Sequence, residues 1–315
     1  MTTAKAHANI ALIKYWGKKD ESLFLPFTSS LSLTLDPLYT ITTVSKDSTL
    51  TKDLFVLNGV TQNSQETEKI SKFVDYFRKN NQFVRIESSN SFATAAGLAS
   101  SASGYAALSK ALNQEFEWRY TDLELSRITR KGSGSATRSL FGGFAVWQTG
   151  DDESSFGYSL PTQMDIVMVI AVVDDQKKSH SSRSMMKRTV QESAYFEAWV
   201  QQSERDFSDM LIAVTERDLR RIGLIAERNA MMMHATLLAN QTPFFYLQPK
   251  SLEIIQLVQQ LREQGIVAYY TMDAGPNVKI ITNSTDQAKV IEQLSEILNQ
   301  DNIIIAKPGP GASIL

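Results

Sequence analysis

The chain has 315 residues, of which 43% are hydrophobic and 21% charged, so it is long enough for two globular domains that share a cleft. Its formal net charge of −2 argues against a nucleic-acid-binding protein, although a local basic patch is compatible with it. The absence of cysteine excludes disulfides, thiolate metal sites and a cysteine nucleophile, and the three scattered histidines form no zinc-binding pattern.

The N-terminal segment has no long apolar stretch suited to a signal peptide. Residues 166–173 form the longest apolar run of interest, which is far too short to span a membrane. The run is rich in β-branched residues and lies between Asp165 and Asp174, so it predicts a buried strand. We therefore expect a soluble, cytoplasmic protein that binds neither nucleic acid nor membrane.

The first half of the chain is predicted to be rich in strands. Alternating or β-branched residues predict strands at 31–35, 39–44, 54–57, 83–87 and 144–148. Asp36-Pro37 predicts a turn between the first two strands, and Asn58-Gly59 predicts a hairpin after the third. Helical spacing predicts helices at 66–79, 103–114 and 121–130.

The second half changes character after the apolar run. A polar, basic loop (174–183) precedes a helical region (184–239) that contains three consecutive methionines, which are expected to fill the core. Further elements are predicted as helix 249–264, strands 266–272 and 277–282, helix 285–299 and strand 303–307. This alternation predicts a split βαβ or ferredoxin-like α+β domain. We place the domain boundary near residue 180, giving domains 1–180 and 181–315 and allowing for the last strand to return to the first domain.

Residues 92–108, FATAAGLASSASGYAAL, contain a run of small and hydroxyl-bearing residues that ends in an apolar helical pattern. Such a run leaves backbone N–H groups accessible, and the helix N-terminus adds further donors and a partial positive charge. Together these features predict a phosphate-binding loop. It is not a Walker loop, because no Gly-Lys-Ser/Thr follows Gly97. The alternative is a flexible loop capped by Ser101 or Ser103.

Three other polar segments stand beside apolar ones. Residues 14–19 (KYWGKK) follow an apolar strand, and their cations and aromatic groups are suited to binding a phosphate-bearing ligand. The alternative is that these residues are the solvated end of the strand. Residues 130–139 (RKGSGSATRS) combine glycine, hydroxyl and cationic groups, and their alternative is a basic loop between helices. Asp273, in the segment 271–277, is a turn former when taken alone but a candidate base beside a phosphoryl donor. Together the segments indicate phosphoryl transfer to a small anionic alcohol.

The segments NIALIKYWGK, AAGLASSASG, RKGSGSA-R-SLFGG and DAGPN, in this order, resemble the mevalonate diphosphate decarboxylase family of the GHMP kinase superfamily. The resemblance covers essentially the whole chain. It implies an α+β fold, the GHMP kinase fold, with an N-terminal domain like ribosomal protein S5 domain 2 and a smaller C-terminal ferredoxin-like domain. It also implies a homodimer and an active site between the domains.

The reaction implied by the resemblance is ATP-dependent decarboxylation of (R)-5-diphosphomevalonate to isopentenyl diphosphate, carbon dioxide, ADP and phosphate. The catalytic residues implied are Asp273, Lys18 and Arg138. Asp273 would orient or deprotonate the C3 hydroxyl, Arg138 would hold the carboxylate, and Lys18 would lie near the diphosphate. The other implied substrate contacts are Tyr15, Trp16, Gly17, Ser133, Gly134, Ser135, Ser182 and Arg183. ATP would contact Ala96, Gly97, Leu98, Ala99, Ser100, Ser101, Ala102, Ser103, Gly104 and Lys178. Ser101 is also the candidate contact for Mg²⁺, which the ATP phosphates would mainly hold.

The sequence departs from the usual family pattern at Ala93, Thr137 and Met185, which stand where proline, cysteine and glycine are common. None of the three removes a charged group, but Met185 is expected to stiffen the family's mobile loop. Two other functions remain open at this point. One is a kinase of the same superfamily that phosphorylates mevalonate or phosphomevalonate without decarboxylation. The other is a non-catalytic nucleotide-binding regulator, which would have no need of a base such as Asp273.

Overall fold

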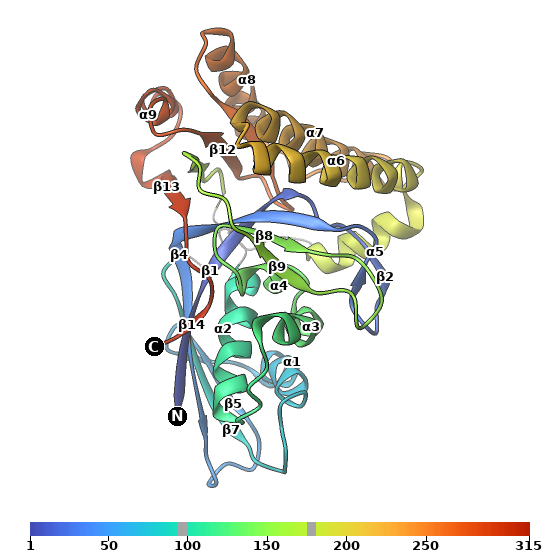
Figure 1. Ribbon diagram of the computed structural model, residues 1–315, viewed down its shortest axis with the longest axis vertical. Helices are drawn as coiled ribbons and strands as arrows, with labels where there is room; N and C mark the ends of the chain where they lie inside the picture. Colours follow the sequence, from blue (N-terminus) through green and yellow to red (C-terminus); the bar gives the residue numbers. More distant parts are fainter. Residues whose placement is uncertain (93–99, 175–180) are drawn as a thin grey trace.

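The structure is a computed structural model that describes residues 1–92, 100–174 and 181–315. Figure 1 shows the helices of the N-terminal half in the lower part of the molecule and most helices of the C-terminal half in the upper part. The N-terminal strands are β1 (Thr2–Ile13), β2 (Lys18–Asp20), β3 (Leu25–Pro26), β4 (Ser30–Lys46), β5 (Leu54–Leu57), β6 (Val60–Thr61), β7 (Val84–Asn90), β8 (Phe144–Trp147) and β9 (Gly157–Leu160). The helices of this half are α1 (Ser64–Val74), α2 (Ser100–Glu115), α3 (Asp122–Gly132) and α4 (Ala136–Ser139).

The C-terminal half adds strands that extend the same sheet. These strands are β10 (Val167–Ala171), β11 (Tyr269–Met272), β12 (Val278–Thr282), β13 (Ile303–Pro308) and β14 (Ser313–Ile314). The helices are α5 (Ser182–Glu192), α6 (Phe196–Glu216), α7 (Leu219–Leu238), α8 (Pro249–Glu263) and α9 (Gln287–Ser295), with a 3₁₀ turn at Gln300–Asn302. Strands β11, β12, β10 and β13 pair antiparallel, and β13 pairs with β4. The two halves are therefore joined through backbone hydrogen bonds.

The chain ends beside the N-terminal strands, because β14 pairs antiparallel with β1. Strand β10 lies before residue 180 in sequence, yet it pairs with β12 and β13 of the second half. The division of the chain at residue 180 stays a prediction. Among the described residues, no helix has the length and apolar character needed to cross a membrane.

Strand β4 corrects one feature of the sequence-based prediction. The two strands predicted at 31–35 and 39–44 are a single strand, and Asp36-Pro37, which was expected to form a turn, lies inside it with a cis peptide bond. The pairing of β4 with β1 is irregular between His7 and Asn9, opposite this segment. Proline is tolerated in a strand at such an irregularity, because its missing N–H breaks no regular ladder there.

Other predicted elements are present with shifted ends. The Asn58-Gly59 hairpin is confirmed, since β5 and β6 pair across it and both turn residues have positive φ. The helix predicted at 66–79 begins at Ser64 and already ends at Val74. The region predicted as helical from 184 divides into α5, α6 and α7, and strand β9 was not predicted.

Two helices pack on the sheet at positions that shape the site. Helix α2 buries a line of alanines, including Ala102, Ala106 and Ala107, against β1 and β4, where small side chains permit close approach. Helix α7 approaches β11 closely at Gly223, where an added Cβ would lie 2.1 Å from Cγ of Tyr269. Met233 on α7 is buried, as expected for the methionine cluster.

Candidate active site

Asp273 lies directly after β11 and is held by two lysines. Nζ of Lys14 is 2.7 Å from Oδ1 of Asp273, and Nζ of Lys279 is 3.5 Å from Oδ2. The lysine side chains are only 2% and 1% exposed, whereas that of Asp273 is 27% exposed. The carboxylate is therefore fixed from inside the protein and still accessible from outside.

Lys14 is placed by the end of β1 and by helix α7. The strand ends at Ile13, and the backbone N–H of Lys14 donates to Oδ1 of Asn229 at 2.8 Å. The amide of Asn229 donates in turn to Ser203 and Asp206 on α6, each at 3.0 Å. A fully buried polar network therefore ties the end of β1 to the α6–α7 pair and holds Lys14 in position.

Burial lowers the pKa of Lys14 to about 8, although Asp273 opposes that change. Lys279 and Arg138, which also face Lys14, lower its pKa further. His234 on α7 is uncharged at neutral pH, because burial lowers its pKa to about 4. Among the described residues, the cations of this group are thus Lys14, Lys279 and Arg138.

The lowered pKa of Lys14 leads to a pH prediction. Lys14 is protonated below about pH 8 and loses its charge above that value, so its ion pair with Asp273 weakens as the pH rises. If the chain has the activity that the resemblance implies, we expect kcat/KM for diphosphomevalonate to fall as the pH rises, with a midpoint near pH 8. The measurement is kcat/KM between pH 6 and 10, with protein integrity checked by circular dichroism at each pH. A flat profile through pH 10 would contradict the assignment.

Arg138, on the short helix α4, is buried close to the same carboxylate. Its guanidinium donates to the hydroxyl of Ser30 on β4, and its Nε has no hydrogen-bond partner among the described residues. Burial lowers the pKa of Arg138 to about 10, while the charge of Asp273 opposes the shift. Arg138 therefore stays cationic at neutral pH, with donor capacity left for an anion.

The loop before α4 packs against Tyr15. A Cβ added to Gly134 would lie 2.7 Å from the Trp147 ring and 2.8 Å from the Tyr15 ring, so only glycine fits there. The Tyr15 and Trp147 rings meet edge-on with centroids 4.7 Å apart. Burial raises the pKa of the Tyr15 hydroxyl, which therefore remains a neutral group.

The two serine-containing segments predicted to bind phosphate or substrate come together. The hydroxyls of Ser133 and Ser135 are 3.2 Å apart, and that of Ser133 is 3.5 Å from the hydroxyl of Ser101 on α2. Helix α2 begins at Ser100, three residues before the helix predicted at 103–114, and the phosphate-binding loop before it stays a prediction. Ala96, Gly97, Leu98, Ala99 and Lys178, predicted to contact ATP, lie outside the described residues.

The remaining predicted ATP contacts on α2 differ in where they lie. Ser101 is exposed, and a Cβ added to Gly104 would meet no atom within 4 Å. Ala102 and Ser103 are buried, and the Ser103 hydroxyl lies 2.7 Å from that of Thr40 on β4. The side chain of Ser103 therefore faces the sheet, whereas that of Ser101 is exposed beside Ser133 and accessible to a ligand.

This difference predicts separate effects for two alanine variants. Ser101→Ala should weaken ATP binding several-fold while leaving the melting temperature unchanged, because its hydroxyl supports no part of the core. Ser103→Ala should instead cost about 1 kcal/mol of unfolding free energy through loss of the Thr40 hydrogen bond. ATP titration and thermal unfolding of both variants check this pair, and the reverse pattern would count against it.

Lys18 belongs to a second cationic group. Nζ of Lys18 lies 4.1 Å from the centre of the Phe24 ring, and Cζ of Arg183 lies 5.4 Å from the same centre. Lys18 also forms an ion pair with Glu21 at 2.8 Å. Burial lowers the pKa of Lys18, and Arg183 adds to that effect while Glu21 opposes it. The structure thus brings Lys18 to Arg183, whereas the ion pairs described for Asp273 are with Lys14 and Lys279.

Trp16 and Gly17 serve packing in this structure. Trp16 is 2% exposed within an apolar cluster that includes Met185, Phe196 and Trp199. Gly17 has a φ of +91°, and a Cβ added there would lie 2.8 Å from the Phe196 ring. The backbone at Gly17 therefore needs glycine both for its conformation and for space.

The segment at 181–185 corrects two expectations. Ser182 and Arg183 were expected in a loop, but they form the first turn of α5, with the Ser181 hydroxyl accepting from the backbone N–H of Ser184. Met185 was expected to stiffen a loop, but it is 2% exposed and packs inside the Trp16 cluster. A side chain that buries apolar surface in this way anchors the start of α5.

Sequence reasoning missed Asn229, His234 and Lys279 and gave Lys14 no individual role. The signal for Lys279 was a single cation in the apolar stretch VKIIT, and Lys14 was the first cation after the strand. Among the described residues, no cluster of three or more His, Asp or Glu side chains is placed to hold a metal ion.

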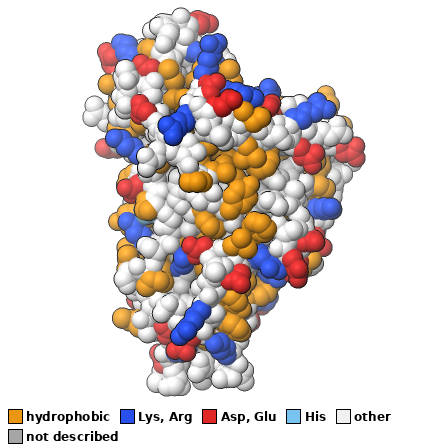
Figure 2. Space-filling view, in the orientation of Figure 1, with side chains coloured by type: hydrophobic (Ala, Val, Ile, Leu, Met, Phe, Trp, Pro, Cys, Tyr) orange, Lys and Arg blue, Asp and Glu red, His pale blue; other side chains and the backbone are white. Residues whose placement is uncertain are grey.

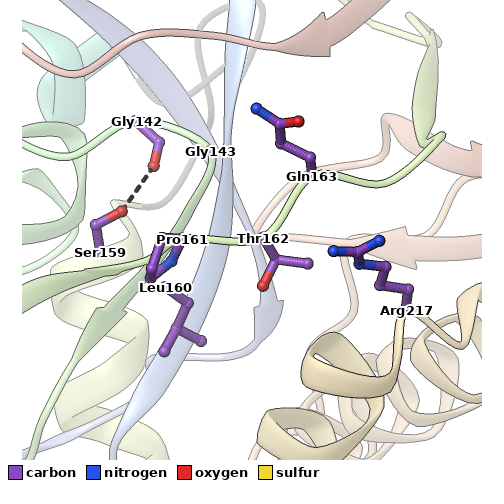
Figure 3. Close-up of a pocket in the computed structure, with 8 residues that line it drawn as sticks. All are labelled: Gly142, Gly143, Ser159, Leu160, Pro161, Thr162, Gln163 and Arg217. Atoms are coloured by element: carbon purple, nitrogen blue, oxygen red, sulfur yellow. Dashed lines mark hydrogen bonds between the residues drawn. The ribbon is translucent and has the colours of Figure 1, made fainter.

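A surface hollow of about 410 Å³ lies away from these residues (Figure 3). It is lined by Gly142, Gly143, Ser159, Leu160, Pro161, Thr162, Gln163 and Arg217. Of the described residues that line it, Arg217 is the one charged residue, and none is a predicted site residue. The candidate active site is therefore the group around Asp273.

The fold and the site together define a class of protein, an enzyme of the GHMP kinase fold. Residues 6–157 match the diphosphomevalonate decarboxylase-like N-terminal domain, and residues 168–308 match the mevalonate 5-diphosphate decarboxylase C-terminal domain. The chain belongs to the diphosphomevalonate decarboxylase family.

Individual relatives agree with this assignment. Diphosphomevalonate decarboxylase of Candida albicans is 38% identical over 92% of this chain and 86% of its own length. The mevalonate diphosphate decarboxylase structure from Staphylococcus aureus is 41% identical, with a TM-score of 0.96, and covers 100% of this chain and 97% of that one. A structure described as MDDEF in complex with MVAPP, AMPPCP and magnesium is 43% identical, with a TM-score of 0.95, and covers 100% and 98% of the two chains.

Proposed function

We propose that the chain catalyses ATP-dependent decarboxylation of (R)-5-diphosphomevalonate to isopentenyl diphosphate, carbon dioxide, ADP and phosphate. The observation that carries the proposal is the exposed side of the Asp273 carboxylate, fixed between Lys14 and Lys279 and beside buried Arg138. In this arrangement, the carboxylate can act as a base or hydrogen-bond acceptor for the alcohol of a substrate. The cations supply positive charge to the anionic groups beside that alcohol.

Each residue has a role in this proposal. Asp273 accepts the hydrogen bond or the proton of the C3 hydroxyl, and Lys14 and Lys279 hold its two oxygens. Arg138 binds the substrate carboxylate with its remaining donors and keeps the bond to be broken aligned with C3. Ser133, Gly134, Ser135 and Tyr15 shape the pocket beside it.

The diphosphate is assigned to the second cationic group. Lys18 and Arg183 meet over the Phe24 ring and supply two positive charges to it. In this assignment, Glu21 gives up its ion pair with Lys18 when the diphosphate binds. Trp16 and Gly17 act through packing, by fixing the backbone between Tyr15 and Lys18.

ATP with Mg²⁺ supplies the phosphoryl group that converts the C3 hydroxyl into a phosphate leaving group. The exposed Ser101 hydroxyl and the N-terminus of α2 fit a nucleotide phosphate, because both offer hydrogen-bond donors where Ser133 approaches. Ser101 would contact Mg²⁺, which the ATP phosphates would mainly hold. Loss of phosphate builds positive charge at C3, and the carboxylate held by Arg138 leaves as carbon dioxide.

The direct test is incubation of the protein with ATP, Mg²⁺ and diphosphomevalonate, with carbon dioxide and ADP measured together. We expect one carbon dioxide for each ADP. A stable phosphate ester and ADP without carbon dioxide would indicate a kinase of the same superfamily, which the comparisons do not favour. Binding of ATP with no turnover at all would indicate a regulator.

We also propose that the protein works as a homodimer in the cytoplasm. Figure 2 shows hydrophobic side chains gathered in a band across one face, where a second copy of the chain would bury them. Light scattering coupled to size-exclusion chromatography gives the mass directly. A monomer at micromolar concentration would overturn the homodimer.

A further inference from the structure

Lys279 is a charged residue inside a buried strand. All five residues of β12 are buried, and Lys279 pairs in register with Thr271 of β11 and Ile170 of β10. Burying an ammonium group is unfavourable unless it is paired and hydrogen-bonded. Its Nζ donates to the carbonyl of Asn277 at 3.1 Å and forms the ion pair with Asp273.

The ion pair between Lys279 and Asp273 is expected to contribute little to the stability of the fold. Lys14 is already 2.7 Å from Asp273, so the carboxylate would keep a close cation without Lys279. Replacing a buried charge by an apolar group of similar volume is often neutral or stabilising. A lysine kept at this cost, beside a partly exposed carboxylate, points to a use outside the folding of the strand.

We infer that Lys279 is a positioning residue, which holds Oδ2 of Asp273 so that the carboxylate presents one orientation to the substrate hydroxyl. The inference rests on the proposed function, since it deepens the role of Asp273. With Lys14 on Oδ1 and Lys279 on Oδ2, rotation of the carboxylate would break an ion pair on either side. Arg138 on α4 faces the same group, and neutral His234 on α7 adds no charge to it.

The first test is Lys279→Met, which removes the charge and keeps most of the volume. We expect kcat to fall by about 10- to 100-fold, as misplaced reacting groups typically cost, while the KM values for both substrates change little. The melting temperature should stay the same or rise, because a buried charge is gone. The matched control is Lys289→Met on α9, an exposed lysine paired with Glu292, for which no change in kcat is expected.

A second variant separates charge from packing. The chain contains no cysteine, so in Lys279→Cys a single thiol can be converted with bromoethylamine, in denaturant and before refolding, into a side chain that ends in an ammonium. Rescue of kcat by this treatment is expected. Wild-type protein treated in the same way controls for damage. If treatment restores stability but not kcat, or if Lys279→Met keeps full kcat, the inference is overturned.

A third readout needs no turnover and so separates this inference from the proposed function. Lys279 is one of the groups that lower the pKa of Lys14, so its removal should raise the pKa of Lys14 above about 8. The titration of Lys14, followed by NMR of labelled lysine side chains in wild type and in Lys279→Met, measures this. If wild type releases no carbon dioxide but the shift is present, the proposed function fails and the coupling of the two lysines stands. An unchanged Lys14 titration overturns the inference in either case.

Discussion

Replacing Asp273 by asparagine should lower kcat by about 10³-fold or more, with ATP and diphosphomevalonate still bound. Asparagine keeps the shape of the side chain but can neither take a proton nor balance the surrounding cations. Lys14 and Lys279 both lose their ion pair with Asp273, and the pKa of Lys14 should fall further, because Asp273 is the group that raises it. The loss therefore combines a missing base with a disturbed charge arrangement.

The measurement for Asp273→Asn pairs kcat with the two dissociation constants obtained by titration. The control is Asp301→Asn, an exposed aspartate in the 3₁₀ turn before β13, which should behave as wild type. Turnover within tenfold of wild type would remove Asp273 from the mechanism. A loss of folding, seen by circular dichroism, would mean that Asp273 is needed for the fold.

Arg138→Lys should lower kcat/KM for diphosphomevalonate by roughly 30- to 1,000-fold, which corresponds to a loss of about 2–4 kcal/mol of transition-state stabilisation. Lysine keeps the charge, but an ammonium has no planar pair of donors with which to orient a carboxylate. Arg138 is buried and donates a hydrogen bond to Ser30. A lysine whose ammonium reached the substrate carboxylate would lose this hydrogen bond to Ser30. The affinity for ATP should hardly change, because Arg138 is assigned to the substrate.

The test of Arg138→Lys compares kcat/KM for diphosphomevalonate with the dissociation constant of ATP. Arg221→Lys, in an exposed ion pair on α7, is the control with the same chemical change and should leave both unchanged. If ATP binding were lost while kcat/KM held, the serine-containing segments would have been assigned to the wrong ligands.

The fold was accessible from sequence where local patterns and tertiary packing agree. The buried strand predicted at 166–173, the helix predicted at 103–114 and the Asn58-Gly59 hairpin each have strong local signals, and all are present with shifted ends for the strand and the helix. The turn at Asp36-Pro37 was wrong, because partner strands on both sides carry the chain through a dipeptide that would bend it if isolated. Such pairing depends on residues far apart in sequence, so it cannot be predicted from the local residues alone.

The site was predictable to a similar degree. The Asp273, Arg138 and serine-containing segments came from residue chemistry, and the structure brings Asp273 and Arg138 into one group. Lys14 and Lys279 are 265 residues apart in sequence, and only the sheet brings both to Asp273. The packing role of Trp16 likewise depends on Phe196 and Trp199 of α6, which nothing near Trp16 in sequence indicates.

In the proposed reaction, the C3 oxygen of the substrate leaves as part of phosphate while the carboxylate leaves as carbon dioxide. The most direct measurement uses diphosphomevalonate labelled with ¹⁸O at the C3 hydroxyl, with mass spectrometry of the phosphate released by the wild-type enzyme. One ¹⁸O is expected in each phosphate that is formed together with carbon dioxide. Unlabelled phosphate, with the label left in an organic product or in water, would contradict it.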